Sequence, residues 1–441
     1  MKHKVIVIQC ISSSLNYIDD IRKEGLEPVL MEVNVPPEDK DTVRKILDLE
    51  YSHLKGDRPI VISECPDYCQ TLQLVKDYAP VLVIPGSDYG IELAAKLSSD
   101  LGLPGHNVTR VPFLRRKDKM HEALKDAGIR YIKGLAVSSV EDGIDFYSTE
   151  LKCGAAIVKP LDGGGSVGVM ACHSKDELAE ALRLSIASGG EVLVQEMIKG
   201  TEYYVNTVSS RGRHVVTNIC RYDKIQKGTE RPVYVRATPL PPESEEMTAL
   251  IEYAVNVLDA VGVDIGPSHT EIMVDEKGPV LIEINARLAG AHQPSDWQDS
   301  VLGIHESEIA LRSYLGKDIL ETRSGMKAIG TPGGTKAYPL ISNGLLHCVY
   351  IPHDIDAVDN PIVPLIRSLK SYYGHMRLDA PSFYERTTDL SNIGGIVYLA
   401  HPDVSVLEEE YNRLLDLELN HIEELFTPRK SHLTSLSNQL K

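Results

Sequence analysis

The chain is poor in basic residues relative to acidic ones, and this imbalance argues against one broad class of partner. Its 441 residues include 46 Lys and Arg against 63 Asp and Glu, which gives a formal net charge of −17 at pH 7. Binding to a nucleic-acid backbone needs a basic surface. We therefore expect no nucleic acid as a main partner, whereas a nucleotide site needs only local positive charge.

Long apolar runs and paired cysteines are also missing. No stretch approaches the roughly 20 apolar residues of a membrane span, and MKHK leads directly into a predicted strand rather than into the apolar core of a signal peptide. The 7 cysteines are scattered, and Cys65 and Cys69 lack the second pair of a zinc site. We predict a cytoplasmic protein with reduced thiols and no membrane partner. The P-loop signature G-K-[ST] is absent, which argues against that nucleotide fold.

Strands alternate with helices over the first part of the chain. Strands are predicted at 4–10, 28–33, 59–63 and 81–84, and helices at 16–24, 68–78 and 91–101. This alternation is typical of a parallel sheet with helices on its faces. Loops at the carboxyl ends of such strands, here 12–14 and 85–89, are where these sheets bind ligands.

After about residue 110 the pattern changes to mixed helices and strands. Asp118 is expected to cap a helix ending at Ala127, and Ser174 with Glu177 to form a capping box. The region 130–205 is predicted to hold short strands and one helix, and later helices are expected at 244–260, 305–315 and 404–425. We therefore predict an α/β and α+β protein of three parts: an N-terminal α/β domain (1–110), a central domain (111–325) with a lid-like subdomain (about 130–205), and a C-terminal α+β region (326–441) that ends in a loose tail.

The most informative segment is 269–287, HTEIMVDEKGPVLIEINAR, which predicts a β-hairpin. A three-residue loop at 276–278 would pair residue 275 with 279, and Glu271 with Glu283. Alternate residues of a strand share a face. Three polar side chains of the second strand therefore line up, and the opposite face is apolar: Glu283, Asn285 and Arg287 against Ile282, Ile284 and Ala286.

Two carboxylates facing each other are destabilising unless a cation neutralises them. Two Glu and one Asn side-chain oxygen suit Mg²⁺ or Mn²⁺, which prefer oxygen ligands. We predict a metal site at Glu271, Glu283 and Asn285; the alternative is a surface hairpin with alternating polar residues. Arg287, next on the same face, would bind a carboxylate or a transferring phosphoryl group.

A glycine-rich stretch at 162–168 contains Gly163, Gly165 and Gly168 in the spacing G-x-G-x-x-G, with Gly164 and Ser166 between them. The pattern is weak alone, and it leads into a strand-like stretch rather than into the helix of a dinucleotide fold. It favours a hairpin loop whose N–H groups close over phosphates, against a plain surface loop. Lys159, at the end of the preceding apolar strand, can reach a phosphate as a point charge.

Three other positions carry less weight from the residues alone. Lys119 lies near the start of a helix, where lysines are usually just solvated. The stretch 195–202 joins two strands and offers main-chain groups to a base edge and a carboxylate to a ribose, but a plain polar connection is the simpler interpretation. His292 is also more often a structural residue than a catalytic one.

In this order, these pieces resemble the ATP-grasp superfamily, in which an N-terminal α/β domain precedes two α+β subdomains that grip ATP. The resemblance implies that Lys119 and Lys159 contact phosphates and that residues 163–168 close over them. It implies further that Glu196 and Ile198 flank the adenine, that Met197 between them belongs to the nucleotide site, and that Glu202 binds the ribose. Glu271, Glu283 and Asn285 would hold two Mg²⁺, with Mn²⁺ as a substitute.

Within the superfamily, the stretch 283–292 resembles the L-amino-acid ligases that make dipeptides. That resemblance implies that a carboxylate attacks ATP to give an acyl phosphate, which an amine then converts to an amide. The residues expected to act in catalysis are Arg287, Lys159, His292 and Gly290. Substrate-pocket candidates are 85–89 and Arg236, which is expected in a Pro-rich loop.

Two alternatives remain open at this point. One is a biotin-carboxylase-like or purine-pathway ATP-grasp enzyme, although the chain lacks the A/V-M-K-M segment of a biotin carrier. The other is a nucleotide-binding protein without turnover. The expected partners are amino acids and ATP, and a homodimer is the commonest default for the assembly.

Overall fold

The computed structural model describes residues 2–35, 40–52, 54, 56–161, 168–226, 232–319, 325–331, 333–378 and 383–428. The chain forms two compact units. The first contains Met1–Gly164, Gly168–Arg221 and Leu240–Ile341, and the second contains Tyr222–Pro239 and Ser342–Lys441. The predicted α/β and α+β class is confirmed. The domain boundaries at 110 and 325 stay predictions.

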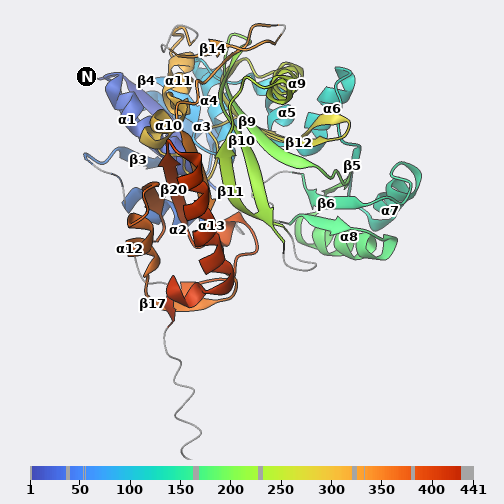
Figure 1. The fold of residues 1–441 in the computed structure, drawn as a ribbon. Coiled ribbons are helices and arrows are strands. Elements are labelled where there is room, and N and C mark those ends of the chain that lie inside the picture. The colour runs from blue at the N-terminus through green and yellow to red at the C-terminus, as the bar shows by residue number, and fades with distance from the viewer. Residues whose placement is uncertain are drawn as a thin grey trace, which may run out of the picture. The chain divides into compact units, whose positions relative to one another are not determined.

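The N-terminal part of the first unit is a four-stranded parallel sheet, in the order β3-β2-β1-β4 (Figure 1). Its strands and helices are β1 (Lys4–Ile8), α1 (Asn16–Lys23), β2 (Glu27–Glu32), α2 (Lys40–Ser52), β3 (Ile60–Ser63), α3 (Tyr68–Asp77), β4 (Pro80–Pro85) and α4 (Ile91–Leu101). The predicted strands and helices are present, and α2 is additional. Apolar strand residues such as Ile6, Ile8 and Val29 are fully buried, because helices cover the sheet.

Gly86 brings the loops after β1 and β4 together at the carboxyl edge of this sheet. A Cβ atom at Gly86 would lie 2.7 Å from the carbonyl oxygen of Gln9 and 2.8 Å from Cα of Cys10. The N–H of Gly86 donates to Ile8 O at 2.7 Å. Only glycine allows this close approach, and the two loops that it joins are those predicted to bind a ligand.

The lid subdomain is an antiparallel sheet in the order β5-β8-β6-β7, with two helices on one face (Figure 1). Its elements are β5 (Gly134–Val137), α7 (Val140–Thr149), β6 (Ala156–Pro160), β7 (Met170–Cys172), α8 (Lys175–Gly189) and β8 (Val192–Glu196). The prediction of one helix was wrong, because Ser139 caps a second one, α7. The hairpin of β6 and β7 is confirmed; the predicted glycine-loop residues Gly163, Gly164, Gly165 and Ser166 lie outside the described residues.

Two helix caps in the first unit differ from the predictions. Helix α6 (Lys117–Asp126) begins one residue before Asp118, whose carboxylate instead pairs with the Arg116 side chain at 3.0 Å. Ser174 accepts from the N–H of Glu177, but Glu177 in turn accepts from His173 N and not from Ser174 N. The capping box is therefore half formed.

The rest of the first unit centres on antiparallel strands in the order β13-β12-β9-β10, with β15 beside β10. The elements are α5 (Val111–Arg115), β9 (Thr201–Ser210), β10 (Arg213–Ile225, whose last residues belong to the second unit), α9 (Glu245–Val261), β12 (Ile265–Asp275), β13 (Gly278–Asn285), α10 (Ser295–Leu302), α11 (Glu306–Tyr314), β14 (Lys327–Ala328) and β15 (Lys336–Ala337). The predicted helices at 244–260 and 305–315 are confirmed as α9 and α11.

The second unit has its own core around an antiparallel sheet in the order β11-β16-β20-β18. Its elements are β11 (Val233–Pro239), β16 (Asn343–Cys348), β17 (Ile355–Asp359), α12 (Ile362–Arg367), β18 (Tyr372–Met376), β19 (Phe383–Tyr384), β20 (Ile396–His401), α13 (Val404–Asn420) and β21 (Thr427–Pro428). Helix α13 ends earlier than predicted. Arg236 lies on strand β11 and not in the predicted loop, and its Nη1 donates to Glu408 at 2.8 Å.

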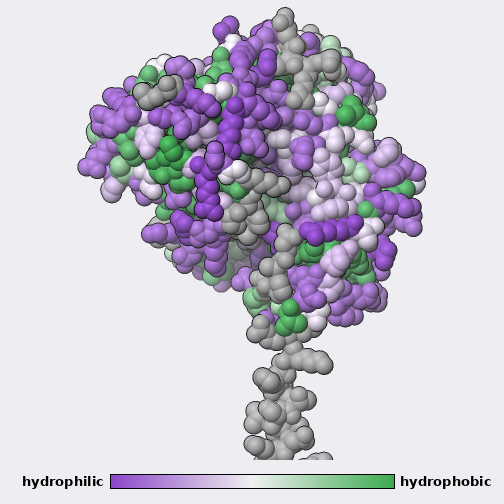
Figure 2. Space-filling model, turned by 90° about the vertical axis from the view of Figure 1, so that its left-hand side faces the viewer, coloured by the Kyte–Doolittle hydropathy of each residue, from purple (hydrophilic) through white to green (hydrophobic). Residues whose placement is uncertain are grey.

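The surface in Figure 2 is mostly hydrophilic, with small apolar patches between polar side chains. The large apolar residues that are most exposed include Leu184, Ile341 and Phe383, which come from distant parts of the sequence. Among the described residues, no helix is both long and apolar enough to cross a membrane.

A charge cluster around the buried side chain of His305 connects helices α1 and α11. Its Nδ1 lies 2.9 Å from Asp299 and its Nε2 lies 3.2 Å from Asp20. Burial disfavours the charged ring, but the hydrogen bonds and charges of Asp20 and Asp299 outweigh it and raise the pKa of His305 to about 9. The imidazolium form therefore stabilises the fold at neutral pH.

This cluster predicts a loss of stability at alkaline pH. The pKa of His305 is raised in the folded state, so its contribution is complete below about pH 6.5 and disappears as the pH rises through about 9. We expect the free energy of unfolding to fall by up to about 3 kcal/mol between pH 6.5 and 9.5, measured by urea unfolding. His305→Asn should flatten this dependence; an equal slope in both proteins would contradict the assignment.

Candidate active site

The hairpin of β12 and β13 places the two predicted metal-binding carboxylates directly opposite each other. Glu271 pairs with Glu283, and His269 with Asn285. The predicted loop, however, was wrong. Asp275 pairs with Gly278, not with residue 279, so the turn has two residues, and Gly278 at φ 99° accommodates it.

A β-bulge between Leu281 and Glu283 compensates for the shorter turn. Ile272 pairs with Leu281 and Glu271 with Glu283, so Ile282 is the extra residue. As a result, Leu281 and Ile284 are fully buried and Ile282 is half-buried. The bulge thus turns Leu281 toward the core and keeps Glu283 on the polar face.

Glu283 is buried and Glu271 is half-buried, and the two carboxylates are unequally neutralised. Nζ of Lys117 lies 2.9 Å from Oε2 of Glu283, and Nδ2 of Asn285 donates to Oε1 at 3.1 Å. Burial alone would raise the pKa of Glu283, but Lys117 outweighs it and lowers the pKa. Burial and the like charge of Glu283 raise the pKa of Glu271, against the hydrogen bond from His269. The negative charge of this pair favours the binding of a cation.

Lys159, at the end of β6, brings a second ammonium group to these carboxylates. It is 6% exposed. Burial, and then the like charge of Lys117, lower its pKa to about 8, while Glu283, Glu271 and Glu202 oppose this shift. A further negative charge nearby, such as a phosphate, would stabilise the charged form of this lysine.

Lys119, by contrast, is not brought to the carboxylates. Its ammonium lies 2.6 Å from Glu122 on the same helix, and its side chain is 40% exposed. Helix residues two apart point to different sides, so Lys117 and Lys119 cannot share a face of α6. Sequence reasoning missed Lys117; the register of α6 is the signal that distinguishes the two.

Arg287 is held by the loop after β4. Its Nε and Nη2 donate to Oδ2 of Asp88, at 3.0 and 2.6 Å, and its Nη1 donates to Leu288 O at 2.9 Å. These bonds leave guanidinium N–H groups for another acceptor. Oδ1 of Asp88 is buried and has no hydrogen-bond partner in the part of the chain that the structure describes.

The segment after Arg287 is strained and is held by the loop after β1. Ala291 and His292 have φ values of 56° and 24°, which non-glycine residues adopt only when the surroundings enforce them. The N–H of His292 donates to Ser12 Oγ at 2.7 Å, its Nδ1 lies 2.9 Å from Ser12 O, and Gln293 N donates to Ser13 Oγ. A Cβ atom at Gly290 would meet none of the described atoms within 4 Å. Gly290 and His292 therefore lie beside the predicted binding edge.

The donor set suits a hard divalent cation that also binds a polyphosphate. No cluster of three His, Cys, Asp or Glu side chains around a metal position occurs among the described residues. Because Nδ2 of Asn285 donates to Glu283, its amide oxygen remains for a cation. Two carboxylates and one amide oxygen leave coordination positions for phosphate oxygens and water, as Mg²⁺ prefers.

A family model described as an ATP-grasp domain matches residues 154–295. This range contains Lys159, Glu202, Glu271, Glu283 and Arg287. The chain has an ATP-grasp domain. The resemblance to the ATP-grasp superfamily that the sequence motifs indicated is confirmed for this range.

Three other similarities cover different shares of the chain. Dapdiamide A synthase of Enterobacter agglomerans is 30% identical over 238 residues, which cover 51% of this chain and 54% of that protein. A D-alanine–D-alanine ligase of Pediococcus pentosaceus is 28% identical over 132 residues, covering 29% of this chain and 37% of that one. The crystal structure of an L-amino acid ligase from Bacillus licheniformis has a TM-score of 0.72 at 16% identity, covering 94% of this chain and 98% of that one. The first two matches cover about half or less of those proteins, and the third shows the fold alone.

The stretch that is predicted to contact the adenine and the ribose follows β8. The N–H groups of Glu196 and Met197 donate to Lys133 O at 2.8 Å and to Ala155 O at 3.0 Å. Glu202, on β9, is 8% exposed and interacts electrostatically with Lys159 and Glu271. The structure therefore brings Glu202 into the charged cluster of Lys159 and Glu271.

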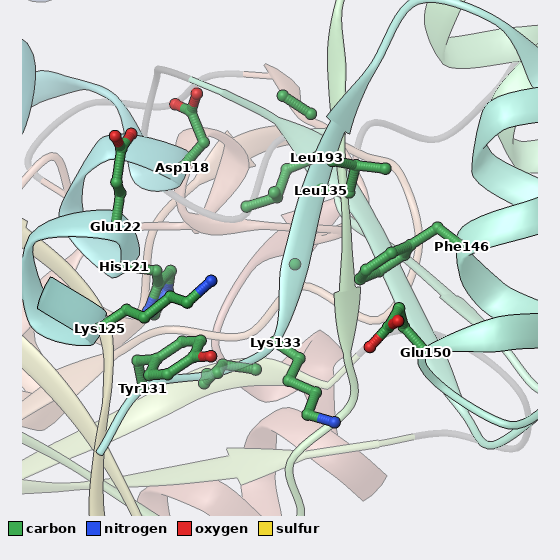
Figure 3. Close-up of a pocket in the computed structure, with 13 residues that line it drawn as sticks. Asp118, His121, Glu122, Lys125, Tyr131, Lys133, Leu135, Phe146, Glu150 and Leu193 are labelled. Carbon is green, nitrogen blue, oxygen red and sulfur yellow. The ribbon is translucent and has the colours of Figure 1, made fainter. Parts of the chain in front are cut away.

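A pocket of about 600 Å³ lies beside helix α6, strand β5 and helix α7 (Figure 3). It is lined by Asp118, His121, Glu122, Lys125, Tyr131, Ile132, Lys133, Gly134, Leu135, Ala136, Phe146, Glu150 and Leu193. His121 is 5% exposed, and neither ring nitrogen has a partner among the described residues. Burial, with the charges of Lys159 and Lys117, lowers its pKa to about 3, so the ring is neutral. The facing carboxylates do not line this pocket.

Proposed function

We propose that this chain is an ATP-dependent carboxylate–amine ligase that joins two L-amino acids and releases ADP and phosphate. The observation that carries the proposal is the pair of Glu271 and Glu283, which face each other in one ladder while Nζ of Lys117 lies 2.9 Å from Glu283. Such a pair has no structural benefit of its own. Its chemistry fits the metal–nucleotide end of an ATP-dependent enzyme, in line with the ATP-grasp domain.

At the nucleotide end, the proposal gives the residues the tasks that the family resemblance implies, with Lys117 in the place of Lys119. Glu271, Glu283 and Asn285 would hold two Mg²⁺, and bound Mg²⁺ would neutralise the phosphates. Lys117 and Lys159 would bind phosphate oxygens, with residues 163–168 closing over them. Glu202 would bind the ribose, and Ile198, flanked by Glu196 and Met197, the adenine.

The proposed reaction has two steps. A carboxylate oxygen of the first amino acid attacks the γ-phosphorus of ATP, the bond to the β–γ bridging oxygen breaks, and ADP leaves. The amine nitrogen of the second amino acid then attacks the acyl carbon, phosphate leaves with the electrons of the C–O bond, and the nitrogen loses a proton. Catalysis of the first step is mainly positioning and charge neutralisation, which buried lysines and Arg287 supply.

At the amino-acid end, Arg287 and Asp88 offer both charges that a zwitterion needs. The free N–H groups of Arg287 suit the reacting carboxylate or acyl phosphate. The unpartnered Oδ1 of Asp88 suits an α-ammonium group. Gly290 leaves space beside them, and His292, fixed by Ser12, would border the same substrate.

The test is ADP and phosphate release with ATP and Mg²⁺ across pairs of the twenty amino acids, with products identified by mass. We expect release only when a suitable pair is present, together with one amide product per ADP. Glu283→Gln, which removes one carboxylate of the facing pair, serves as the inactive control. Release that depends on the pair but gives no amide would refute ligation, and release that needs bicarbonate would indicate a carboxylase.

A further inference from the structure

A row of buried polar side chains lies behind Glu271. Nε2 of His269 lies 3.2 Å from Oε1 of Glu271, and Nδ1 of the same ring lies 2.8 Å from Oδ1 of Asn206. Nδ2 of Asn206 donates to Oε2 of Glu306 at 3.4 Å. His269, Asn206 and Glu306 are 5%, 1% and 3% exposed. The row runs from the carboxylate pair into the protein interior, where these three side chains are shielded from solvent.

The backbone fixes this row. His269 on β12 and Asn206 on β9 are direct partners in the ladder, and the ring of Tyr204 packs on the imidazole at 4.9 Å. Glu306 is the first residue of helix α11, and its N–H donates to Gln298. Strand partners and a packed ring give the imidazole little freedom to rotate. The nitrogen that faces Glu271 therefore has a defined position.

The far end of the row is neutral near pH 7. Burial raises the pKa of Glu306 to about 8. The imidazole consequently faces an amide on one side and the carboxylate of Glu271 on the other. Burying so many polar groups is costly unless each is bonded, and a purely apolar sheet interior would avoid that cost.

We propose that His269 is a positioning residue, which holds one oxygen of Glu271 so that the other is presented to the metal–nucleotide complex. Carboxylates that bind metals are commonly oriented by hydrogen bonds from neighbouring side chains, and losing such a bond costs about 10–100-fold in metal affinity. The inference rests on the proposed function only for the metal role of Glu271. It concerns binding, so it can be tested without any ligase product.

A second buried histidine in the same sheet provides a matched control. Nδ1 of His214 on β10 lies 2.7 Å from Ser209 Oγ, and its Nε2 lies 3.2 Å from Asp259. It is 8% exposed. It thus also bridges a β9 side chain and a carboxylate, but Asp259 is largely exposed and is not one of the facing carboxylates. A structural role alone would make the two histidines equivalent.

Two substitutions separate the two sides of the ring. His269→Gln keeps an N–H near the position of Nε2, toward Glu271. His269→Asn keeps a polar group near Nδ1, toward Asn206, and removes the contact with Glu271. The probe is Mn²⁺ binding, followed by electron paramagnetic resonance in the presence of a non-hydrolysable ATP analogue, together with the Mg²⁺ dependence of ADP formation.

We expect His269→Asn to weaken Mn²⁺ binding about 10–100-fold. The Mg²⁺ concentration for half-maximal ADP formation should rise by the same factor, with kcat at saturating Mg²⁺ within about 3-fold of wild type. His269→Gln and His214→Asn should bind Mn²⁺ like wild type. If His269→Asn does not fold, Asn206→Ala, which frees the ring from its inner partner, should still weaken binding while His214→Asn does not.

Equal metal affinity in His269→Asn, His269→Gln and wild type would overturn the inference, as would a loss in kcat with unchanged metal affinity. Failure of the proposed function gives a different result. In that case wild type would bind Mn²⁺ with the nucleotide analogue but make no amide, and the comparison among the variants would still decide the role of His269.

Discussion

Replacing Lys117 by methionine is expected to lower the rate of ADP formation at least about 100-fold, the scale seen when one group that stabilises developing charge is removed. Lys117 is 7% exposed and its ammonium lies 2.9 Å from Glu283. Its loss removes a phosphate-binding charge and leaves Glu283 without its nearest cation. The measurement is a coupled ADP assay at saturating amino acids, with ATP affinity determined separately.

Lys119→Met is the matched control, because Lys119 lies two residues away on the same helix. Its ammonium pairs with Glu122 on an exposed surface, where ion pairs contribute little. We expect a rate within about 2-fold of wild type. Lys117→Arg, which keeps the charge, should fold like wild type and retain part of the activity. If Lys119→Met were the inactive variant, the assignment of Lys117 would be wrong.

The second large effect is expected in the second unit, where His347 and Glu418 form a fully buried ion pair. The two side chains are 0% exposed, with Nε2 of His347 2.5 Å from Oε1 of Glu418 and Nδ1 2.9 Å from Val235 O. Burial lowers the pKa of His347, but the charge of Glu418 outweighs it and raises the pKa. His347→Ala should therefore leave a buried carboxylate unpaired and cost about 3–5 kcal/mol in the free energy of unfolding.

Urea unfolding followed by circular dichroism measures this loss. Arg183→Ala, in the exposed pair with Glu180, is the control and should change stability by less than about 0.5 kcal/mol. A double variant with apolar residues at 347 and 418 should recover much of the loss, because no charge is then left buried. A loss below about 1 kcal/mol for His347→Ala would show that the pair is not isolated from water.

Local patterns in the sequence predicted the facing carboxylates correctly, because side-chain alternation in a strand depends only on neighbouring residues. The same reasoning missed the bulge at Ile282. A three-residue turn and a two-residue turn with a bulge give the same pairing of Glu271 with Glu283. Only the burial of Leu281 distinguishes them, and that depends on helices and strands distant in the chain.

Helix register and long-range contacts set the other limits. Lys117 and Lys119 are the same residue type, two positions apart in the sequence. Which of them points toward the carboxylates depends on where α6 begins. Arg287 and Asp88 are 199 residues apart in the chain, so no spacing rule connects them, although the predicted binding edge at 85–89 contains Asp88. The roles of the residues in the stretch 195–202 came from family resemblance, and they remain predictions.

The bulge gives strand β13 one residue, Ile282, that has no partner on β12. A chain without this residue would still place Glu271 opposite Glu283, because the ladder would then run regularly from the turn. Proteins with the same paired carboxylates can therefore differ by a residue in the separation between them. A search pattern with a fixed gap between the two glutamates would miss such relatives, whereas a comparison of strand pairing would find them.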